Sequence, residues 1–412
     1  MALALVALFV LANVAALCGS ACAVPRLWLW LHAPALTCAL LHRPLVLLHS
    51  ASETHVQFRV VLQSACAGEL LQLDCGGASR VLRVESARSA AVTSVTIELP
   101  VSAPPTVACA VQGAPRCEFR VRWPERRERV TAVVVSDSQR NVDVFRSLLR
   151  AASQRDDAVD LLLFGGDATQ SAAPLEWTQY AAAYEELAHV VPIAHARGNH
   201  DSGPLAPFFG PSASVLTFAF GSAQLLVLDT ALVTHPHAYS PKARAAFDTA
   251  LRAALASEAW RTAAFRVALA HVPRRIAFWE PHAWHERGEW RQPAAVAAQL
   301  APALRAARCD VLISGHSHMY SYAVEESGNN SNSRGDDAHT MHEFIVGGAG
   351  GALESAHERV AAERFASVER LVHHSVRMSV SECGLEWRAY GSDGSVVHDV
   401  FVKSRNVECQ SL

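Results

Sequence analysis

Five short polar clusters, each at the end of an apolar run, constrain the fold of this chain more than any other feature. The runs have strand length, and segments with helical patterns separate them. This alternation predicts an α/β fold whose active-site residues follow the carboxyl ends of the strands. In chain order, the clusters are 136–139, 165–167, 198–201, the single residue His271, and 315–318.

The clusters supply the ligand types that two metal ions need around a phosphate. Paired metal ions, about 3.5 Å apart, require oxygen and imidazole ligands and one carboxylate that bridges them. We predict that Asp167 is this bridge. The predicted first site is completed by Asp137, Gln139 and His318, and the second by Asn199, His271 and His316.

This set of residues predicts hydrolysis of phosphate esters. A hydroxide bound by both metals is the expected nucleophile. We expect His200, oriented by Asp201, to stabilise the transition state or to protonate the leaving oxygen. A lone histidine such as His271 is more often a core residue, so the prediction depends on the ordered set.

The chain before residue 125 has a different pattern. Apolar and polar residues alternate over 55–62, 79–84 and 91–99, and turn residues separate these runs. Period-two alternation predicts a small antiparallel β-sandwich, which we assign to residues 24–124. The predicted catalytic domain covers residues 131–403, after a charged linker.

The first 23 residues resemble a secretory signal. They are almost wholly apolar and end in Ala21-Cys22-Ala23, a small-x-small cleavage pattern. We therefore expect a secreted or secretory-pathway protein with no transmembrane helix after the signal. The segment has no Lys or Arg before the apolar run, so an uncleaved signal anchor is the alternative. Asn329 begins a glycosylation sequon, which predicts a glycoprotein.

Cysteine content indicates disulfide bonds. The chain has ten cysteines, and cleavage after Ala23 would remove two of them. An even number in a secreted chain favours disulfides, although free buried thiols are the alternative. The pairs we expect are Cys66–Cys75, Cys109–Cys117 and Cys383–Cys409.

The ordered motifs resemble those of the calcineurin-like metallophosphoesterases. Asp137-Ser138-Gln139, Gly198-Asn199-His200-Asp201 and Gly315-His316-Ser317-His318 carry the resemblance, which looks closest to the branch that includes purple acid phosphatases. It implies a four-layer α/β/β/α sandwich after the β-sandwich. It also implies two divalent or mixed-valence metal ions, such as Fe, Zn or Mn.

Two positions depart from this family pattern. The first motif is commonly Asp-x-His, and the neutral amide of Gln139 is a weaker ligand than imidazole. Purple acid phosphatases have a tyrosine ligand three residues after the bridging aspartate, where this chain has Gln170. We therefore expect a colourless enzyme.

Three functions are compatible with these residues. The first is a phosphomonoesterase similar to acid phosphatases, and the second is a phosphodiesterase acting on nucleotides or phospholipid headgroups. The third is a secreted binding protein with a weakened metal site. A net charge of −3 argues against a nucleic-acid duplex as partner, so we expect a small phosphate ester.

Residues near the fourth cluster have two interpretations each. Arg274 and Arg275 could bind the substrate phosphate or could simply be surface charges. Trp279, Trp284 and Trp290 could form a substrate lid or could cover the sheet.

Overall fold

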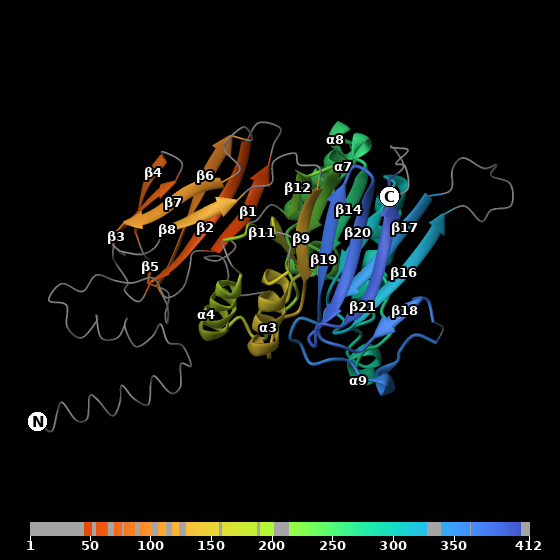
Figure 1. Ribbon diagram of the computed structural model, residues 1–412. Coiled ribbons are helices and arrows are strands. Elements are labelled where there is room, and N and C mark those ends of the chain that lie inside the picture. Colours follow the sequence, from red (N-terminus) through yellow and green to blue (C-terminus); the bar gives the residue numbers. More distant parts are fainter. Residues whose placement is uncertain are drawn as a thin grey trace, which may run out of the picture.

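The structure of the protein is a computed structural model (Figure 1). The predicted signal, the sequon, and Cys66, Cys117 and Cys409 lie outside the residues that it describes. The described residues are 45–51, 55–64, 70–75, 78–83, 85–86, 91–100, 106–112, 118–122, 129–155, 159–187, 190–201, 214–327, 339–362 and 364–404.

A ten-stranded mixed sheet carries the first three polar clusters. Its centre is parallel, because β9, β10 and β11 pair in parallel and β1 pairs in parallel with β11. The β9 strand is buried at six of its seven residues, as expected for a parallel strand that is covered on both faces. The strand order is β21 (Val396–Lys403), β20 (Gly384–Gly391), β19 (His374–Ser381), β9 (Arg129–Val135), β10 (Leu161–Phe164), β11 (Ile193–His195), β1 (Leu45–Ala51), β2 (His55–Ser64), β6 (Ala91–Pro100) and β5 (Glu85–Ser86).

A seven-stranded sheet carries the last two clusters. Its strands β13, β14, β15 and β17 are parallel, whereas β12, β16 and β18 pair with their neighbours in the antiparallel direction. The order is β12 (Val215–Phe220), β13 (Ala223–Leu228), β14 (Phe265–Ala270), β15 (Val311–Ser314), β17 (His339–Val346), β16 (Tyr320–Ser327) and β18 (Val368–Arg370).

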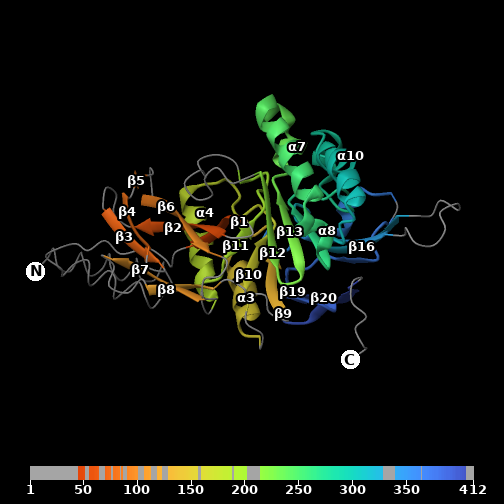
Figure 2. The same ribbon diagram turned by 90° about the horizontal axis from the view of Figure 1, so that it is seen from above.

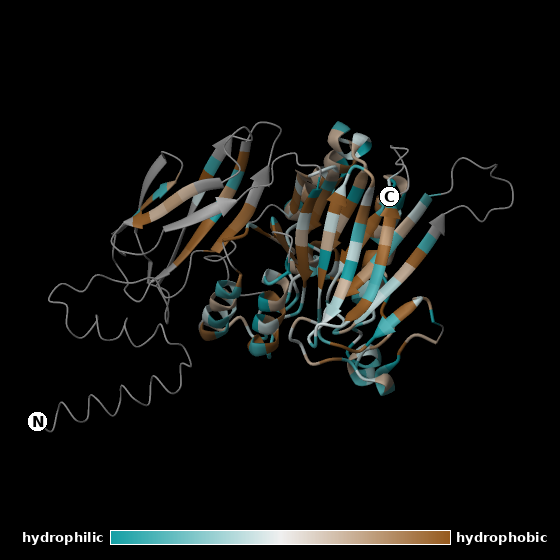
Figure 3. Ribbon diagram, viewed as in Figure 1, coloured by the Kyte–Doolittle hydropathy of each residue, from teal (hydrophilic) through white to brown (hydrophobic). Residues whose placement is uncertain are grey.

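Apolar side chains of the two sheets share one core between them. Val134 and Met378 of the larger sheet belong to the same buried cluster as Val267 and Phe344 of the smaller sheet. Apolar residues accordingly mark the strands of both sheets in Figure 3. Burial of this apolar surface is the main force that holds the sheets face to face.

Helices cover the outer face of each sheet. The helices α3 (Val142–Ser153) and α4 (Pro174–Ala183) pack on the larger sheet, and η1 (Tyr184–Glu186) extends α4. Figure 2 shows α3 on the opposite side of the paired sheets from α7 and α10. This arrangement confirms the predicted four-layer α/β/β/α fold. The smaller sheet is covered by α6 (Ala231–Thr234), α7 (Pro241–Ala256), α8 (Glu258–Thr262) and α10 (Arg291–Ala306).

The predicted N-terminal β-region is present, and it is joined to the larger sheet. A four-stranded antiparallel sheet has the order β4 (Ala78–Arg83), β3 (Leu70–Cys75), β7 (Thr106–Gln112) and β8 (Glu118–Arg122). It packs against β2 and β6, since Leu73 and Val111 share a cluster with Phe58. Parallel pairing of Leu47 with Ile193 then continues the main sheet into this region. The domain limits 24–124 and 131–403 stay predictions.

The described disulfide differs from the two predicted local pairs. Cys75 in β3 is bonded to Cys109 in β7, so the predicted pairs Cys66–Cys75 and Cys109–Cys117 are wrong. These two cysteines face each other because β3 and β7 pair with Cys75 opposite Cys109. Cys383 is also disulfide-bonded, and its predicted partner lies outside the described residues. Cys309 is a free buried thiol.

Among the helices of the described segments, none combines the length and the apolar character that a membrane crossing requires.

Candidate metal centre

All five polar clusters lie at the carboxyl ends of strands, as predicted. Asp137 and Gln139 follow β9, Asp167 follows β10, and Asn199 follows β11. From the other sheet, His271 follows β14, and His316 and His318 follow β15. The paired sheets therefore bring all seven predicted ligands to one edge.

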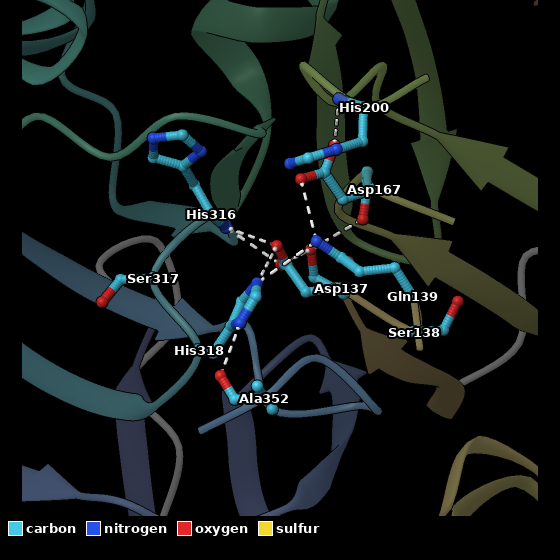
Figure 4. A network of polar contacts seen from close by, with 12 residues as sticks. Asp137, Ser138, Gln139, Asp167, His200, His316, Ser317, His318 and Ala352 are labelled. Atoms are coloured by element: carbon cyan, nitrogen blue, oxygen red, sulfur yellow. Dashed lines mark hydrogen bonds and ion pairs between the residues drawn. The ribbon is translucent and has the colours of Figure 1, made fainter. Parts of the chain in front are cut away.

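The three residues predicted for the first site lie together (Figure 4). His318 Nε2 is 3.5 Å from Asp137 Oδ1, and Gln139 Nε2 is 3.3 Å from His318 Nε2. His318 Nδ1 donates to the Ala352 carbonyl at 2.7 Å, which directs Nε2 toward the other two side chains.

The three residues predicted for the second site form a neighbouring group. Asn199 Oδ1 is 2.9 Å from His271 Nε2 and 2.8 Å from His316 Nδ1. His271 Nδ1 donates to the Gly165 carbonyl at 2.8 Å, so its Nε2 faces the group. A carbonyl partner of this kind commonly fixes the tautomer of a metal-binding histidine.

Asp167 contacts both groups. Its Oδ2 is 3.3 Å from Gln139 Nε2 and 3.4 Å from His271 Nε2. Its Oδ1 accepts a hydrogen bond from the backbone N–H of His200. This central position is the one that a bridging carboxylate requires.

Three of the seven residues have left-handed backbone conformations. The φ angles of Asp137, Asp167 and His316 are 62°, 55° and 71°. Such conformations are uncommon outside glycine, and they concentrate at functional sites where surrounding contacts hold them. Gly315 permits the close approach, because a Cβ there would lie 2.4 Å from Asp137 Oδ2.

Burial and mutual charge shift the pKa values of these side chains. Burial lowers the pKa of His271, but Asp167, Asp137 and the Gly165 carbonyl together raise it to about 10. Burial raises the pKa of Asp167, but His271 outweighs it, so the pKa is well below its ordinary value. Burial and the charge of His271 lower the pKa of His316 far below its usual range. A neutral His316 retains a lone pair that can bind a metal.

Two buried polar atoms of the site have no hydrogen-bond partner. They are Gln139 Oε1 and His316 Nε2, and both belong to predicted ligands. An unsatisfied buried acceptor costs about 1–3 kcal/mol, which a bound cation would offset. Asp167, His271 and His316 also place possible ligand atoms within 4.8 Å of one another. The residues present therefore fit a metal centre.

His200 lies beside Asp167, and the described hydrogen bonds of its ring do not include Asp201. The Asp201 carboxylate is buried and accepts hydrogen bonds from the backbone N–H groups of Asp167, Ala168 and Gly198. Its role is thus to shape the loops, and burial, together with Asp167, raises its pKa to about 7. His200 Nδ1 contacts the carbonyl of Gln170 at 2.8 Å instead.

Arg274 and Arg275 are occupied by other partners. Arg274 is 9% exposed and forms ion pairs with Glu325 and Glu343, and Arg275 also pairs with Glu343. Both guanidinium groups therefore pair with carboxylates of the smaller sheet, and the burial of Arg274 contradicts the surface role for that residue.

Of the three tryptophans, Trp279 contacts a predicted ligand. Its ring stacks on His316 with centroids 4.5 Å apart. Trp290, by contrast, is exposed.

Sequence reasoning missed the residues that support the ligands. Glu354 accepts from the backbone N–H of His318, and burial raises the pKa of its carboxyl to about 7. Ser136 donates to Asp137 Oδ2 at 2.5 Å. The only sequence feature that could have indicated this role of Ser136 is its position directly before Asp137. Glu354 lies 36 residues from His318 in the chain and had none.

The comparisons with known proteins agree with this geometry. Residues 130–320 match the family model for calcineurin-like phosphoesterases. A search of the curated proteins found no match.

Three solved structures show a similar fold. A purple acid phosphatase from yellow lupin (Lupinus luteus) has a TM-score of 0.63 at 13% identity, covering 87% of this chain and 74% of that chain. A structure described as PhoD has a TM-score of 0.59 at 9% identity, covering 91% and 94%. GAP50 of Plasmodium has a TM-score of 0.53 at 14% identity, covering 68% and 91%.

The family match spans the segment that carries all seven predicted ligands. Residues 130–320 are thus similar to the calcineurin-like phosphoesterases, which agrees with a centre for metal-dependent hydrolysis of phosphate esters.

Proposed function

We propose that the protein is a phosphomonoesterase that holds two metal ions at this centre. The observation that carries the proposal is the continuous contact network of the seven ligands, with Asp167 touching both groups. Asp137, Gln139 and His318 would hold one ion, and Asn199, His271 and His316 the other. When bound, such ions supply Lewis-acid activation of water and neutralise charge on the phosphoryl group.

The remaining chemistry belongs to the side chains around the ligands. With Nδ1 at the Gln170 carbonyl, His200 can use Nε2 to bind the phosphoryl group or donate a proton to the leaving oxygen. Asp201 keeps the loops of Asp167 and Gly198 in place through its backbone hydrogen bonds. Trp279 shields one face of the His316 ring.

The first experiment compares p-nitrophenyl phosphate with bis-p-nitrophenyl phosphate as substrates. We expect faster turnover of the monoester, about two metal ions per chain, and loss of activity with a chelator that is restored by metal. Faster turnover of the diester would establish the phosphodiesterase alternative. The visible spectrum of the purified holoprotein should lack an iron–tyrosinate band, since Gln170 stands at the tyrosine position.

A binding protein with a weak metal site is the second candidate. Gln139 favours it, because an amide is a weaker ligand than imidazole. GAP50 is described as the anchor in the inner membrane complex of Plasmodium. A similar fold therefore also occurs in a protein that is described as an anchor. Less than one metal ion per chain, with any residual hydrolysis unaffected by Asp167→Asn, would support this candidate.

We also propose that the protein resides in an oxidising compartment. The Cys75–Cys109 disulfide and the bonded Cys383 support this, because disulfides persist mainly in secreted and luminal proteins. Localisation of the tagged full chain, together with sensitivity of its glycans to a glycosidase, tests the proposal.

A further inference from the structure

We propose that Arg140 binds a second anionic group on the substrate, so that the enzyme prefers phosphate esters whose leaving group is itself anionic. This inference rests on the proposed phosphoesterase function and adds a substrate class to it. It concerns a residue directly after the predicted ligand Gln139, outside the metal-binding set.

A hydrogen bond fixes Arg140 on the side of the centre where His200 lies. Arg140 Nε donates to Gln170 Oε1 at 2.7 Å. The same Gln170 contacts His200, through its carbonyl at 2.8 Å and its side-chain amide at 3.3 Å from Nδ1. Gln170 therefore holds the guanidinium near His200, and if His200 acts at the leaving oxygen, Arg140 can reach the leaving group.

Among the described residues, none occupies the rest of the Arg140 guanidinium. The side chain is exposed, and no described residue bonds its terminal nitrogens or pairs with it as a carboxylate. Arg129, Arg150 and Arg388 differ, because each of these exposed arginines pairs with a Glu or Asp carboxylate. A planar guanidinium with both terminal nitrogens free matches the oxygens of a phosphate or carboxylate.

The backbone at Arg140 is a second, independent observation. Its φ angle is 73°, in the left-handed region that non-glycine residues seldom adopt. Asn or Gly would adopt this conformation with less strain. Two predicted ligands of the same edge, Asp137 and Asp167, share this conformation, which concentrates at functional sites.

Two matched substrate pairs test the preference. 1,3-Propanediol bisphosphate and 1,3-propanediol monophosphate are both phosphate monoesters, but only the bisphosphate has an anionic leaving group when one phosphoryl is cleaved. Glycerate 3-phosphate and glycerol 3-phosphate make the same comparison with a carboxylate, so the two pairs distinguish a phosphate from a carboxylate partner.

We expect the metal-loaded wild-type enzyme to favour the anionic member of at least one pair. In Arg140→Ala this preference in kcat/KM should fall about tenfold, mainly through a higher KM for the anionic member. Arg140→Lys should retain part of the preference, and Arg252→Ala, at an exposed arginine on α7, should retain all of it.

Equal losses for both members of each pair would overturn the proposal. Arg140 would then act only by positioning Gln170 and His200, and Gln170→Ala would reproduce its effect on kcat. If the wild-type protein hydrolysed no ester, the proposed function would fail separately. Binding of inorganic pyrophosphate relative to inorganic phosphate would still test Arg140, and an unchanged ratio in Arg140→Ala would refute the proposal.

Discussion

The two central sheets contribute different chemistry to the metal centre. The ten-stranded sheet supplies carboxylate and amide side chains at the ends of β9, β10 and β11, whereas the seven-stranded sheet supplies only imidazoles from β14 and β15. The sheets are nevertheless interdependent, because the Gly165 carbonyl beyond β10 fixes the ring of His271 beyond β14. Neither sheet alone could hold a metal pair, so the face-to-face packing of the sheets creates the site.

The largest expected effect comes from the carboxylate that both groups contact. Asp167→Asn keeps the shape but removes the charge that faces His271, so we expect kcat/KM to fall about 1000-fold. Metal content should fall below that of the wild type, as measured by elemental analysis of the purified protein. Asp393→Asn, in an exposed turn, is the control. Unchanged metal content and activity would show that Asp167 is only a structural residue.

A smaller loss is expected on the imidazole side. His316→Ala removes one nitrogen ligand and leaves the bridging carboxylate, so we expect a decrease of about 100-fold in activity, with weaker metal binding. Excess metal should restore part of the activity, which titration at a fixed substrate concentration would reveal. If His316→Ala were more harmful than Asp167→Asn, the carboxylate would not be the centre of the site.

Position 139 tests whether the site of Asp137, Gln139 and His318 binds its metal ion more weakly than the other site. We expect Gln139→Ala to reduce metal affinity about tenfold, and Gln139→His to raise it by a similar factor. Metal titrations that resolve the two binding steps would measure these changes. An effect on the tighter step alone would reverse the assignment of the two sites.

The sequence predicted where the proposed ligands lie in the fold, but it did not predict the contacts that support them. Every predicted ligand follows a strand whose apolar run is visible in the sequence. Such a run depends only on neighbouring residues, so it can be recognised without the fold. Cys75 and Cys109 show the limit, because their pairing depends on β3 lying beside β7. Glu354 and the left-handed backbone of Asp137 likewise depend on contacts between distant segments. The backbone hydrogen bonds of Asp201 could not be predicted for the same reason, since its partners Asp167 and Ala168 follow a different strand.

The smallest effect on activity is expected at His374, which contacts both sheets. His374 begins β19 of the larger sheet, and its ring contacts Tyr320 of the smaller sheet with centroids 5.2 Å apart. Burial lowers the pKa of this histidine to about 4, from an ordinary value of 6.5. As the pH falls below 6.5, His374 therefore becomes protonated in the unfolded chain. In the folded protein it stays neutral until the pH reaches about 4. The free energy of unfolding should decrease over this interval, by about 3 kcal/mol from this group.

His374→Asn removes the titrating ring but keeps an N–H donor for the Val372 carbonyl, which His374 Nδ1 contacts at 2.9 Å. Denaturant unfolding of the metal-free protein between pH 4 and 6.5 should show a flatter pH dependence in the variant. The exposed His237→Asn is the matched control, and it should follow the wild type. Phosphatase activity near neutral pH should change little, because no described contact joins His374 to a predicted ligand. If the free energy of unfolding of the variant depended on pH as steeply as that of the wild type, His374 would not be the cause of the acid destabilisation. If the variant lost activity, contacts between the two sheets away from the predicted ligands would also be needed for catalysis.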